Sequence, residues 1–295
     1  MDHKESFLQY LRVEKRYSPL TVRSYISDLD QFENHLSSDG FSGNPCDITT
    51  PDIRSWIVSL VEKGYSAKSV HRKISSLRIF YRFLRKCGYA TGDPSAKVVL
   101  PKIRKKLPVF VAEGTMDKLL DGYEFGDDFS GIRNSVIIEM LYTTGMRRAE
   151  LTGLKDADVD LQGATVRVTG KRNKQRIIPL LKPVTKRLEE YIKVRNECFP
   201  VRQESWFFIG NKGNKLYDKY VYNIVRKYLA MVTTIEKKSP HILRHSFATH
   251  MLNRGADLNS IKEFLGHANL SATQISTHNS FEQLRKIYKQ AHPSA

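Results

Sequence analysis

The amino-acid sequence predicts a mainly α-helical fold with one small β-sheet, arranged as two domains. Residues 1–98 contain segments in which apolar side chains recur every three or four positions, the period of an amphipathic helix. Residues 164–180 instead alternate apolar and polar side chains on both sides of a polar turn, which is typical of a β-hairpin. Three prolines between residues 94 and 108 disfavour helix. We therefore expect a helical domain at 1–98, a linker at 99–108 and a second, mixed α/β domain at 109–295.

The first domain is expected to hold four helices, because its helix starts and stops are marked. Ser and Thr side chains cap the first free N–H groups of a helix, and proline is tolerated at its first position. A first helix is expected near residues 3–16. The next three are expected to begin at Ser18, Thr50 and Ser66, the first two followed by proline. Glycine at Gly64 and Gly88 ends the last two.

The second domain combines the hairpin with helices before and after it. The apolar run 131–145 predicts a buried helix that ends at Gly145. Further helices are expected over 182–197, 217–231, 241–253, 257–265 and 281–291. The candidate reactive side chains described below stand at defined places in this pattern, among them a position after a helix-ending glycine, a hairpin tip and a helix.

The chain is strongly basic, with 48 lysines and arginines against 31 acidic residues and a net charge of +17. Residues 1–108 hold 19 of the basic and 11 of the acidic residues, so both domains carry an excess. A solvated surface would be the plain explanation, but an excess of this size favours a polyanion, with nucleic acid ahead of an acidic membrane. We expect both domains to touch the same nucleic acid.

A membrane partner and an oxidising compartment are not expected. No apolar run approaches the roughly 20 residues of a membrane-spanning helix. The chain begins without a secretory signal pattern. Its three cysteines, Cys46, Cys87 and Cys198, have neither disulfide nor zinc spacing. These features predict a cytoplasmic protein with reduced thiols.

Candidate DNA contacts lie on the fourth helix and on the linker. On the helix, the basic side chains lie largely off the apolar stripe; in the linker they form an extended strap that fits a DNA backbone, although an ordinary solvated linker would have the same composition. The residues are Lys68, Arg72, Arg78, Arg82, Lys102, Arg104, Lys105 and Lys106.

A constellation of basic and imidazole side chains in the second domain indicates phosphodiester chemistry. Its members are Arg147 in TTGMRRAEL, Lys171 in TGKRNKQRIIPL, His241 and Arg244 in PHILRHSFATHML, and His267 in FLGHANLSATQ. Two arginines suit the non-bridging oxygens of a phosphate, because each guanidinium is permanently charged and can bind in a bidentate way. A lysine could protonate a departing 5′ oxygen, and the histidines could accept a proton from a nucleophile or donate to the phosphate.

Alternatives to this constellation remain. Each residue alone could be an ordinary surface side chain. His241 and His245 are four residues apart on a helix, as in some zinc sites, but no HExxH glutamate or cysteine cluster accompanies them, so no metal or other cofactor is expected. His245 fits a structural hydrogen bond behind Arg244. A metal-dependent nuclease would need acidic ligands near the arginines.

Together these motifs resemble the tyrosine recombinase (phage integrase) family, and within it the Xer-like simple recombinases. HILRHSFATH followed by LGHANLSATQI is specific to it, and TGMRRAEL resembles its first arginine box. The resemblance covers nearly the whole chain. It implies catalytic roles for Arg147, Lys171, His241, Arg244 and His267, and a two-domain clamp around DNA.

The family's tyrosine nucleophile would stand nine residues after His267, where this sequence has Ser276. A serine hydroxyl is less acidic than a phenol and ends roughly 4 Å nearer the backbone. We therefore expect DNA binding without cleavage. The serine could be a deliberate substitution or mark a naturally non-catalytic DNA-binding relative. Alternatively, another hydroxyl could serve, Tyr288 being the nearest downstream tyrosine.

The resemblance also implies partners. Family members bind double-stranded DNA at an inverted-repeat core site, one dimer per site, and a homotetramer joins two sites through a Holliday junction. A second recombinase or an activator could take part. The helix at 280–295 would dock into a neighbouring subunit in trans. The chain length and the lack of an arm-binding domain favour a Xer-like recombinase over a large phage integrase.

Overall fold

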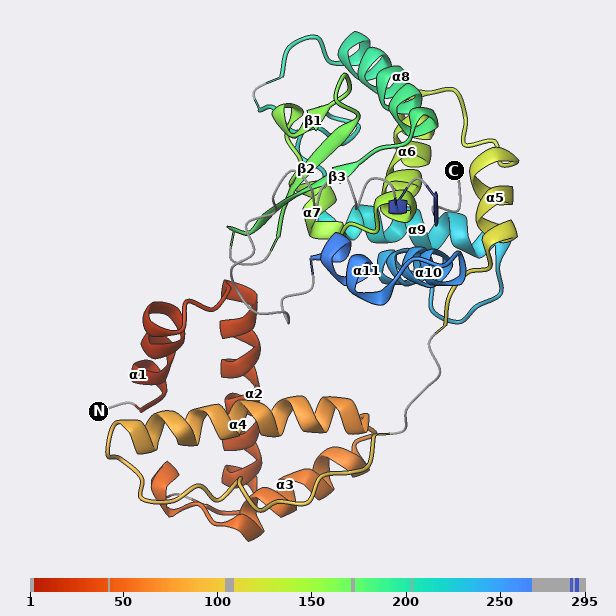
Figure 1. Cartoon of the computed structure of the whole chain (residues 1–295). Helices are drawn as coiled ribbons and strands as arrows, with labels where there is room; N and C mark the ends of the chain where they lie inside the picture. The colour runs from red at the N-terminus through yellow and green to blue at the C-terminus, as the bar shows by residue number, and fades with distance from the viewer. Residues whose placement is uncertain are drawn as a thin grey trace. The chain divides into compact units, whose positions relative to one another are not determined.

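The computed structural model divides the chain into two compact units, Met1–Lys106 and Leu107–Ala295 (Figure 1). It describes residues 3–41, 43–103, 109–170, 173–202, 204–266, 287–288 and 290–291. Each unit has a hydrophobic core of its own. The predicted mainly helical, two-domain fold with one small sheet is confirmed.

All regular structure among the described residues of the N-terminal unit is helical. Its elements are α1 (His3–Gln9), a π-helical turn η1 (Tyr10–Glu14), α2 (Pro19–Ser38), a short 3₁₀ turn η2 (Pro45–Asp47), α3 (Thr50–Glu62) and α4 (Ala67–Lys86). The first predicted helix is therefore α-helical only as far as Gln9, beyond which the hydrogen bonding widens to the π pattern. Helices α2, α3 and α4 pack against one another.

Capping residues set where these helices begin. Ser18 and Ser66 each accept a hydrogen bond from the backbone N–H three residues on, at 3.3 and 3.2 Å. The third start was predicted one residue late. Thr49 is the cap, because its extended backbone lets its N–H and its hydroxyl both donate to Asp52, each at 2.7 Å. Thr50 is already the first helical residue.

Aromatic side chains fill the N-terminal core. Phe32 of α2 meets Trp56 of α3 with ring centroids 4.9 Å apart, and Phe7 of α1 meets Phe80 of α4 at 5.1 Å. All four side chains are buried. Such pairs bury large apolar areas and also fix helix orientation, so the four helices form one rigid support for the residues on their outer faces.

The C-terminal unit surrounds one buried helix. Its elements are α5 (Glu113–Asp121), α6 (Phe129–Thr144), α7 (Arg148–Thr152), η3 (Asp156–Asp158), β1 (Val159–Asp160), β2 (Thr165–Thr169), β3 (Gln175–Pro179), α8 (Lys182–Cys198), α9 (Asp218–Val232), α10 (Pro240–Asn253) and α11 (Leu258–Leu265). Helix α6 packs against α5, α7, α8, α9 and α10. Because it is covered on all sides, its last turn and the loop after it are held firmly in place.

The predicted hairpin is the pair β2–β3, with β1 added at the edge of β2 as a third antiparallel strand. The sheet lies to the left of α6 in the view of Figure 1. Val166 and Val168 of β2 are buried, while Arg167 between them faces outward. Val168 pairs with Arg176 of β3. The hairpin thus carries Arg176 on a rigid strand.

Candidate functional site

Gly145 turns the chain from α6 into the loop that carries Arg147. Its φ of +57° is left-handed, a conformation that favours glycine. A Cβ here would lie 2.6 Å from the ring of Phe247 and 2.7 Å from the side chain of Leu265. Both the backbone angle and the space therefore require glycine, and the tight turn places Arg147 directly before α7.

Arg147 stands at the N-cap of α7, bound to the acidic residue in its first turn. Its backbone N–H donates to Glu150 Oε2 at 2.8 Å, and its guanidinium donates to Oε1 at 2.8 Å. The Arg147 side chain keeps 37% of its surface exposed, whereas that of Glu150 keeps 3%. A buried carboxylate therefore aims an arginine that still reaches solvent.

Arg244 approaches from α10, which begins at Pro240. One terminal nitrogen donates to the carbonyl of Gly145 at 2.6 Å, and the other donates to the carbonyl of Leu265 at 2.8 Å. The residue is 9% exposed. Arg244 therefore ties the loop before Arg147 to the end of α11, and the fold brings the two predicted arginines into one site.

Three arginines meet three consecutive carbonyls at the end of α11. The carbonyl of Phe264 accepts from Arg176 Nε at 2.9 Å, that of Leu265 accepts from Arg244, and that of Gly266 accepts from Arg147 at 3.5 Å. The last carbonyls of a helix lack partners within the helix and carry partial negative charge. Cationic donors from the N-cap of α7, from β3 and from α10 therefore converge where α11 ends.

The concentration of positive charge shows in the pKa of Arg244. Burial, and then the nearby Arg147 and Arg176, lower that pKa from 12.5 to about 10, with Glu150 acting in the opposite direction. The guanidinium nevertheless stays protonated at neutral pH. Glu150 itself has a lowered pKa: burial acts to raise it, but hydrogen bonds and charge from Arg176, with bonds from Arg147, outweigh burial. The site thus combines three cations with one anion and favours an anionic ligand.

Glu150 and Arg176 were not predicted from the sequence as parts of this site. Glu150 had a local signal, because it occupies the N3 position of a capping box whose cap is Arg147. Arg176 had no such signal, since its partners lie 26 and 88 residues away.

The two histidines on α10 lie beside Arg244. His241 is exposed in the first turn of the helix, three residues before Arg244 and hence on the same face. His245 is half-buried one residue after Arg244. The His241 side chain is thus exposed to solvent on the face of α10 that carries the buried Arg244.

Several predicted site residues lie outside the described residues. They are Lys171, His267, Ser276, Arg104, Lys105 and Lys106. Described residues lie next to Lys171 and His267 in the chain. Gly170 and Asn173 flank Lys171 in the β2–β3 connection, and Gly266, which directly precedes His267, belongs to the arginine-bound end of α11.

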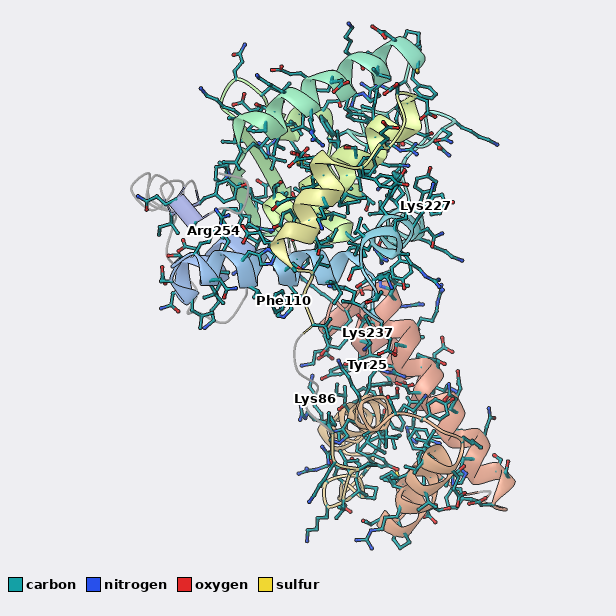
Figure 2. The ribbon with its side chains drawn as sticks, turned by 90° about the vertical axis from the view of Figure 1, so that its right-hand side faces the viewer. Tyr25, Lys86, Phe110, Lys227, Lys237 and Arg254 are labelled. Atoms are coloured by element: carbon teal, nitrogen blue, oxygen red, sulfur yellow. The ribbon has the colours of Figure 1, made fainter. Side chains whose placement is uncertain are left out.

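Of the predicted basic contacts in the N-terminal unit, Lys68 and Arg82 are exposed on α4, and Lys102 is exposed beyond it. Arg78 is half-buried and its Nε donates to the carbonyl of Ser95 at 3.3 Å. Figure 2 shows basic side chains projecting from both units, among them Lys86 and Lys227.

Arg72 belongs to a buried ion-pair network between α2 and α4. Asp28, 1% exposed, accepts from both terminal nitrogens of Arg72, from Lys73 at 3.0 Å and from the hydroxyl of Ser76 at 2.8 Å. Lys73 is 2% exposed, whereas the Arg72 side chain keeps 48%. The network thus holds one guanidinium in place at the surface.

Helix α9 adds two exposed basic side chains that the sequence did not predict as DNA contacts. Lys219 and Arg226 lie at helical spacing, with the exposed but uncharged Asn223 between them. The first turn of α9 is joined to α7, because Asp218 pairs with Arg148 at 3.1 Å and accepts from the hydroxyl of Thr152 at 2.8 Å. Lys219, the residue after Asp218, therefore stands at the end of α9 that is joined to α7.

Tyr288 is buried in the core of its own chain. Its ring stacks on Phe264 with centroids 5.1 Å apart, and its hydroxyl donates to the carbonyl of Thr143 at 2.9 Å. Burial raises the pKa of this phenol far above its usual value. These features argue against Tyr288 as a nucleophile. Docking of the segment 280–295 into a neighbouring subunit stays a prediction.

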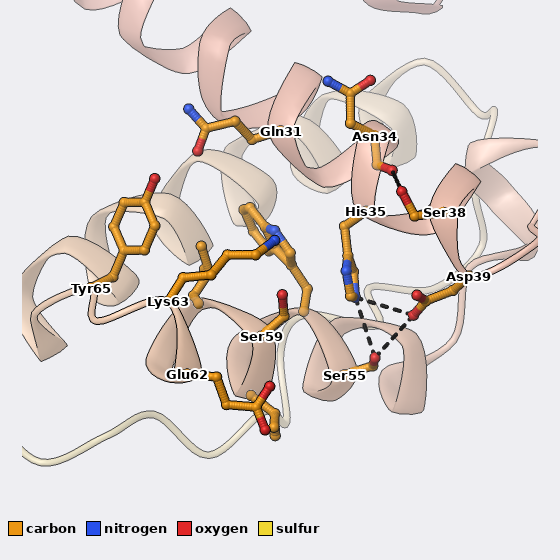
Figure 3. Close-up of a pocket in the computed structure, with 13 residues that line it drawn as sticks. Gln31, Asn34, His35, Ser38, Asp39, Ser55, Ser59, Glu62, Lys63 and Tyr65 are labelled. Atoms are coloured by element: carbon orange, nitrogen blue, oxygen red, sulfur yellow. Dashed lines mark hydrogen bonds and ion pairs between the residues drawn. The ribbon is translucent and has the colours of Figure 1, made fainter.

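In the N-terminal unit, a groove between α2 and α3 is lined by a cluster of His, Ser and Asp side chains (Figure 3). His35 Nε2 lies 3.2 Å from Ser55 Oγ and 3.4 Å from Asp39 Oδ2, and Ser55 Oγ donates to Asp39 Oδ2 at 3.2 Å. A nucleophilic triad needs its serine and its acid at opposite nitrogens of the imidazole. Both groups share one nitrogen here, so this cluster is not such a triad.

Comparison with protein families identifies the class. Residues 111–283 match the phage integrase family and residues 5–88 match the phage integrase N-terminal SAM-like domain. The chain therefore belongs to the phage integrase family.

Its relatives within that family are recombinases. The chain is 38% identical to the tyrosine recombinase XerC of Chlorobaculum parvum, over 99% of this chain and 94% of the relative. It is 39% identical to XerC of Staphylococcus saprophyticus, over 99% and 97%. The chain is thus similar to XerC-type site-specific tyrosine recombinases over its full length, as the resemblance predicted.

Solved structures of recombinases share the fold. The XerH site-specific recombinase bound to its difH substrate, in a pre-cleavage complex, is 25% identical, with a TM-score of 0.70 over 96% of this chain and 82% of that one. A λ integrase dimer bound to a core site, 18% identical, has a TM-score of 0.68 over 92% and 98% and shows the fold alone. Within the described part of the chain, no helix is both long and apolar enough to cross a bilayer.

Proposed function

We propose that this chain is the scaffold of a site-specific DNA recombinase that binds duplex DNA at an inverted-repeat core site but does not cleave it. Active members of this scaffold break and rejoin strands through a covalent 3′-phosphotyrosyl intermediate and a Holliday junction. Four protomers would bring two sites together, one dimer on each, in the cytoplasm. The proposal rests on the convergence of Arg147 and Arg244 at the end of α11 in a chain of this family.

The two arginines would bind the scissile phosphate. Each guanidinium would donate to a non-bridging oxygen, where negative charge grows as the phosphorus becomes five-coordinate. Their positions are set before DNA arrives, because Arg147 is held by Glu150 and Arg244 by two backbone carbonyls. Preorganised donors of this kind stabilise a transition state without reorganising during the reaction.

The other predicted site residues would transfer protons or donate a hydrogen bond. His241, exposed beside Arg244, would accept the proton of the nucleophile. Lys171, in the β2–β3 connection, would protonate the departing 5′ oxygen, and His267 would donate a hydrogen bond to the phosphate. In this scheme cationic side chains supply the charge stabilisation that metal ions supply in many other phosphoryl transfers.

We propose binding without cleavage because Ser276 stands where the family has its tyrosine nucleophile. With an unchanged backbone, the serine oxygen would stop roughly 4 Å short of the place that a tyrosine oxygen reaches. A displacement of about 1 Å can cost on the order of a hundredfold in rate. The alternative function is that of a naturally non-catalytic recombinase relative that binds DNA. Ser276 is the basis of this alternative as well.

Replacing Ser276 by tyrosine tests this proposal. DNA bound by the chain would be selected from a randomised duplex pool, nicked near its centre and incubated with Ser276→Tyr protein. We expect a covalent protein–DNA adduct on a denaturing gel, because the phenol now reaches the phosphate. Ser280→Tyr, which adds the same side chain four residues away, is the matched control and should form none.

Two outcomes bear on the assignment. Arg244→Ala in the Ser276→Tyr background should bind DNA but lose the adduct, since a phosphate-binding donor is missing. A folded, DNA-bound Ser276→Tyr protein that forms no adduct would contradict the nucleophile position and favour the non-catalytic alternative.

A further inference from the structure

Arg176 makes the contacts that join the separate parts of the arginine site. Two of its nitrogens donate to the two carboxylate oxygens of Glu150, at 3.0 and 2.9 Å, and its Nε donates to the carbonyl of Phe264 at 2.9 Å. Its side chain is 16% exposed, so these bonds are largely shielded from water. A two-pronged pair between arginine and carboxylate fixes both distance and angle.

The same carboxylate holds Arg147. Glu150 Oε1 accepts from both Arg147 and Arg176, and Oε2 accepts from Arg176 and from the backbone N–H of Arg147. Arg176 therefore fills the sites on Glu150 that Arg147 leaves, and it keeps the carboxylate ionised by lowering the pKa of Glu150 against burial. Loss of Arg176 would leave the buried carboxylate with the two bonds of Arg147 alone, one on each oxygen.

Arg176 also contacts the end of α11 through more than one atom. A Cβ built on Gly266 would lie 3.3 Å from Arg176 Cδ, so the arginine side chain packs directly against this residue. Gly266 has a φ of +67° and is the C-cap of α11. The next residue in the chain is His267. One strand residue thus contacts both the support of Arg147 and the C-cap of α11.

We propose that Arg176 is a positioning residue of the phosphate site, acting through Glu150 on Arg147 and through Phe264 and Gly266 on the end of α11, where Arg147 and Arg244 also bind. This inference deepens the proposed function and rests on it. Arg176 itself would not touch the phosphate, since its nitrogens are committed to Glu150 and Phe264. Its effect should therefore appear in the behaviour of Arg147 and in the rate of cleavage, with little change in DNA affinity.

The first test uses the chain as it stands, without DNA. The Nε–H signal of Arg147 is assigned by nuclear magnetic resonance through its absence in Arg147→Lys. In Arg176→Gln this signal should shift and broaden, because Glu150 has then lost two of the four hydrogen bonds described above. Arg167→Gln is the matched control: Arg167 lies on the neighbouring strand and pairs with Asp158 on the outer face of the sheet. An unchanged Arg147 signal in Arg176→Gln would overturn the proposal.

The second test uses Ser276→Tyr protein and compares adduct formation in single turnover. Arg176→Gln should slow the reaction roughly 10- to 100-fold, as losses of supporting residues around a site commonly do, while the DNA Kd changes less than about threefold. Arg176→Lys should recover part of the rate, because lysine keeps the charge but cannot bridge Glu150 and Phe264. Arg167→Gln should match the parent.

A modified substrate separates positioning from general destabilisation. Replacing the scissile phosphate by a methylphosphonate removes the charge that Arg147 neutralises, so the defect of Arg176→Gln should shrink on that DNA. An equal defect on both substrates would overturn the link to Arg147. If Ser276→Tyr itself forms no adduct, the proposed function fails, and the Arg147 signal still decides the role of Arg176.

Discussion

A carboxylate lies inside the core of the C-terminal unit, at Glu139 of α6. The residue is 6% exposed, and its Oε2 lies 3.6 Å from Arg187 Nε on α8, beyond hydrogen-bond range. Burial raises the pKa of Glu139 to about 7, although the charge of Arg187 partly offsets this. Arg187 does not depend on Glu139, because it also donates to Ser135 and to the carbonyl of Leu120.

The raised pKa of Glu139 predicts a pH-dependent stability. The pKa of this carboxyl is near its usual 4.5 in the unfolded chain and about 7 in the folded one. The stability that the neutral carboxyl contributes to the folded state is therefore full below pH 4.5 and is lost as pH rises through about 7. Glu139→Gln, which stays neutral, should raise the free energy of unfolding by about 3 kcal/mol at pH 8 and change it little near pH 4. Denaturant unfolding at both pH values measures this.

Exposed Glu189 on α8 provides the control for that measurement. Glu189→Gln should leave the pH profile of stability unchanged. Equal effects of Glu139→Gln at the two pH values would show that the charge of Glu139 is not suppressed in the folded state.

At the scale of elements, α6, α10 and α11 meet at Gly145. The glycine adopts φ +57°, and the side chains of Phe247 on α10 and Leu265 on α11 fill the space where a Cβ would stand. This contact sets the position of both Arg147, two residues on, and Arg244, which binds the Gly145 carbonyl. The packing of three helices is thus coupled to the geometry of the arginine pair.

Gly145→Ala should therefore destabilise the C-terminal unit by about 2 to 3 kcal/mol, through backbone strain and overpacking together. Gly255→Ala is the matched control, because Gly255 also has positive φ, +88°, but nothing lies within 4 Å of its Cβ position. It should cost only about 1 kcal/mol. Similar losses of unfolding free energy for the two variants would mean that the packing at Gly145 adds nothing.

The elements that the sequence predicted correctly carry local signals. Ser18 and Ser66 cap helices next to their own apolar stripes, and the β2–β3 hairpin follows from strict alternation. Helix α5 was not expected, because Ala112 before it makes no side-chain cap and Gly114 lies in its first turn. Helix α7 escaped notice because it is only five residues long.

The residues of the candidate site likewise differ in whether a local sequence signal predicts them. Arg147 and Arg244 stand in recognisable motifs, so their residue types and settings indicated them. Glu150 has a local signal, because it forms a capping box with Arg147. Arg176 acquires its role only when β3, α7 and α11 come together, which depends on tertiary contacts between distant residues, and motif spacing does not encode it.

At the scale of the whole molecule, both units are basic. Residues 1–108 hold 19 lysines and arginines against 11 acidic residues, out of 48 against 31 in the whole chain. Exposed cations of this kind lie on α4 at Lys68 and Arg82, and on α9 at Lys219 and Arg226. Contacts from two units to one duplex would neutralise many phosphates and release their counterions.

The affinity for duplex DNA should consequently fall steeply with salt. For six to ten phosphate contacts, raising salt from about 50 to 200 mM should weaken binding roughly a thousandfold or more. Fluorescence anisotropy across a salt series measures the slope of log Kd against log salt. Arg82→Gln should reduce that slope by about one. A flat response in the parent chain would contradict a two-unit electrostatic contact.

The network around Asp28 has a consequence for the entropy of binding. A free arginine or lysine side chain loses up to about 2 kcal/mol of rotamer freedom when a ligand immobilises it. Arg72 has already lost most of that freedom, because Asp28 and Ser24 hold its guanidinium while 48% of the side chain remains exposed. If Arg72 meets a phosphate, folding has therefore ordered its side chain in advance of binding.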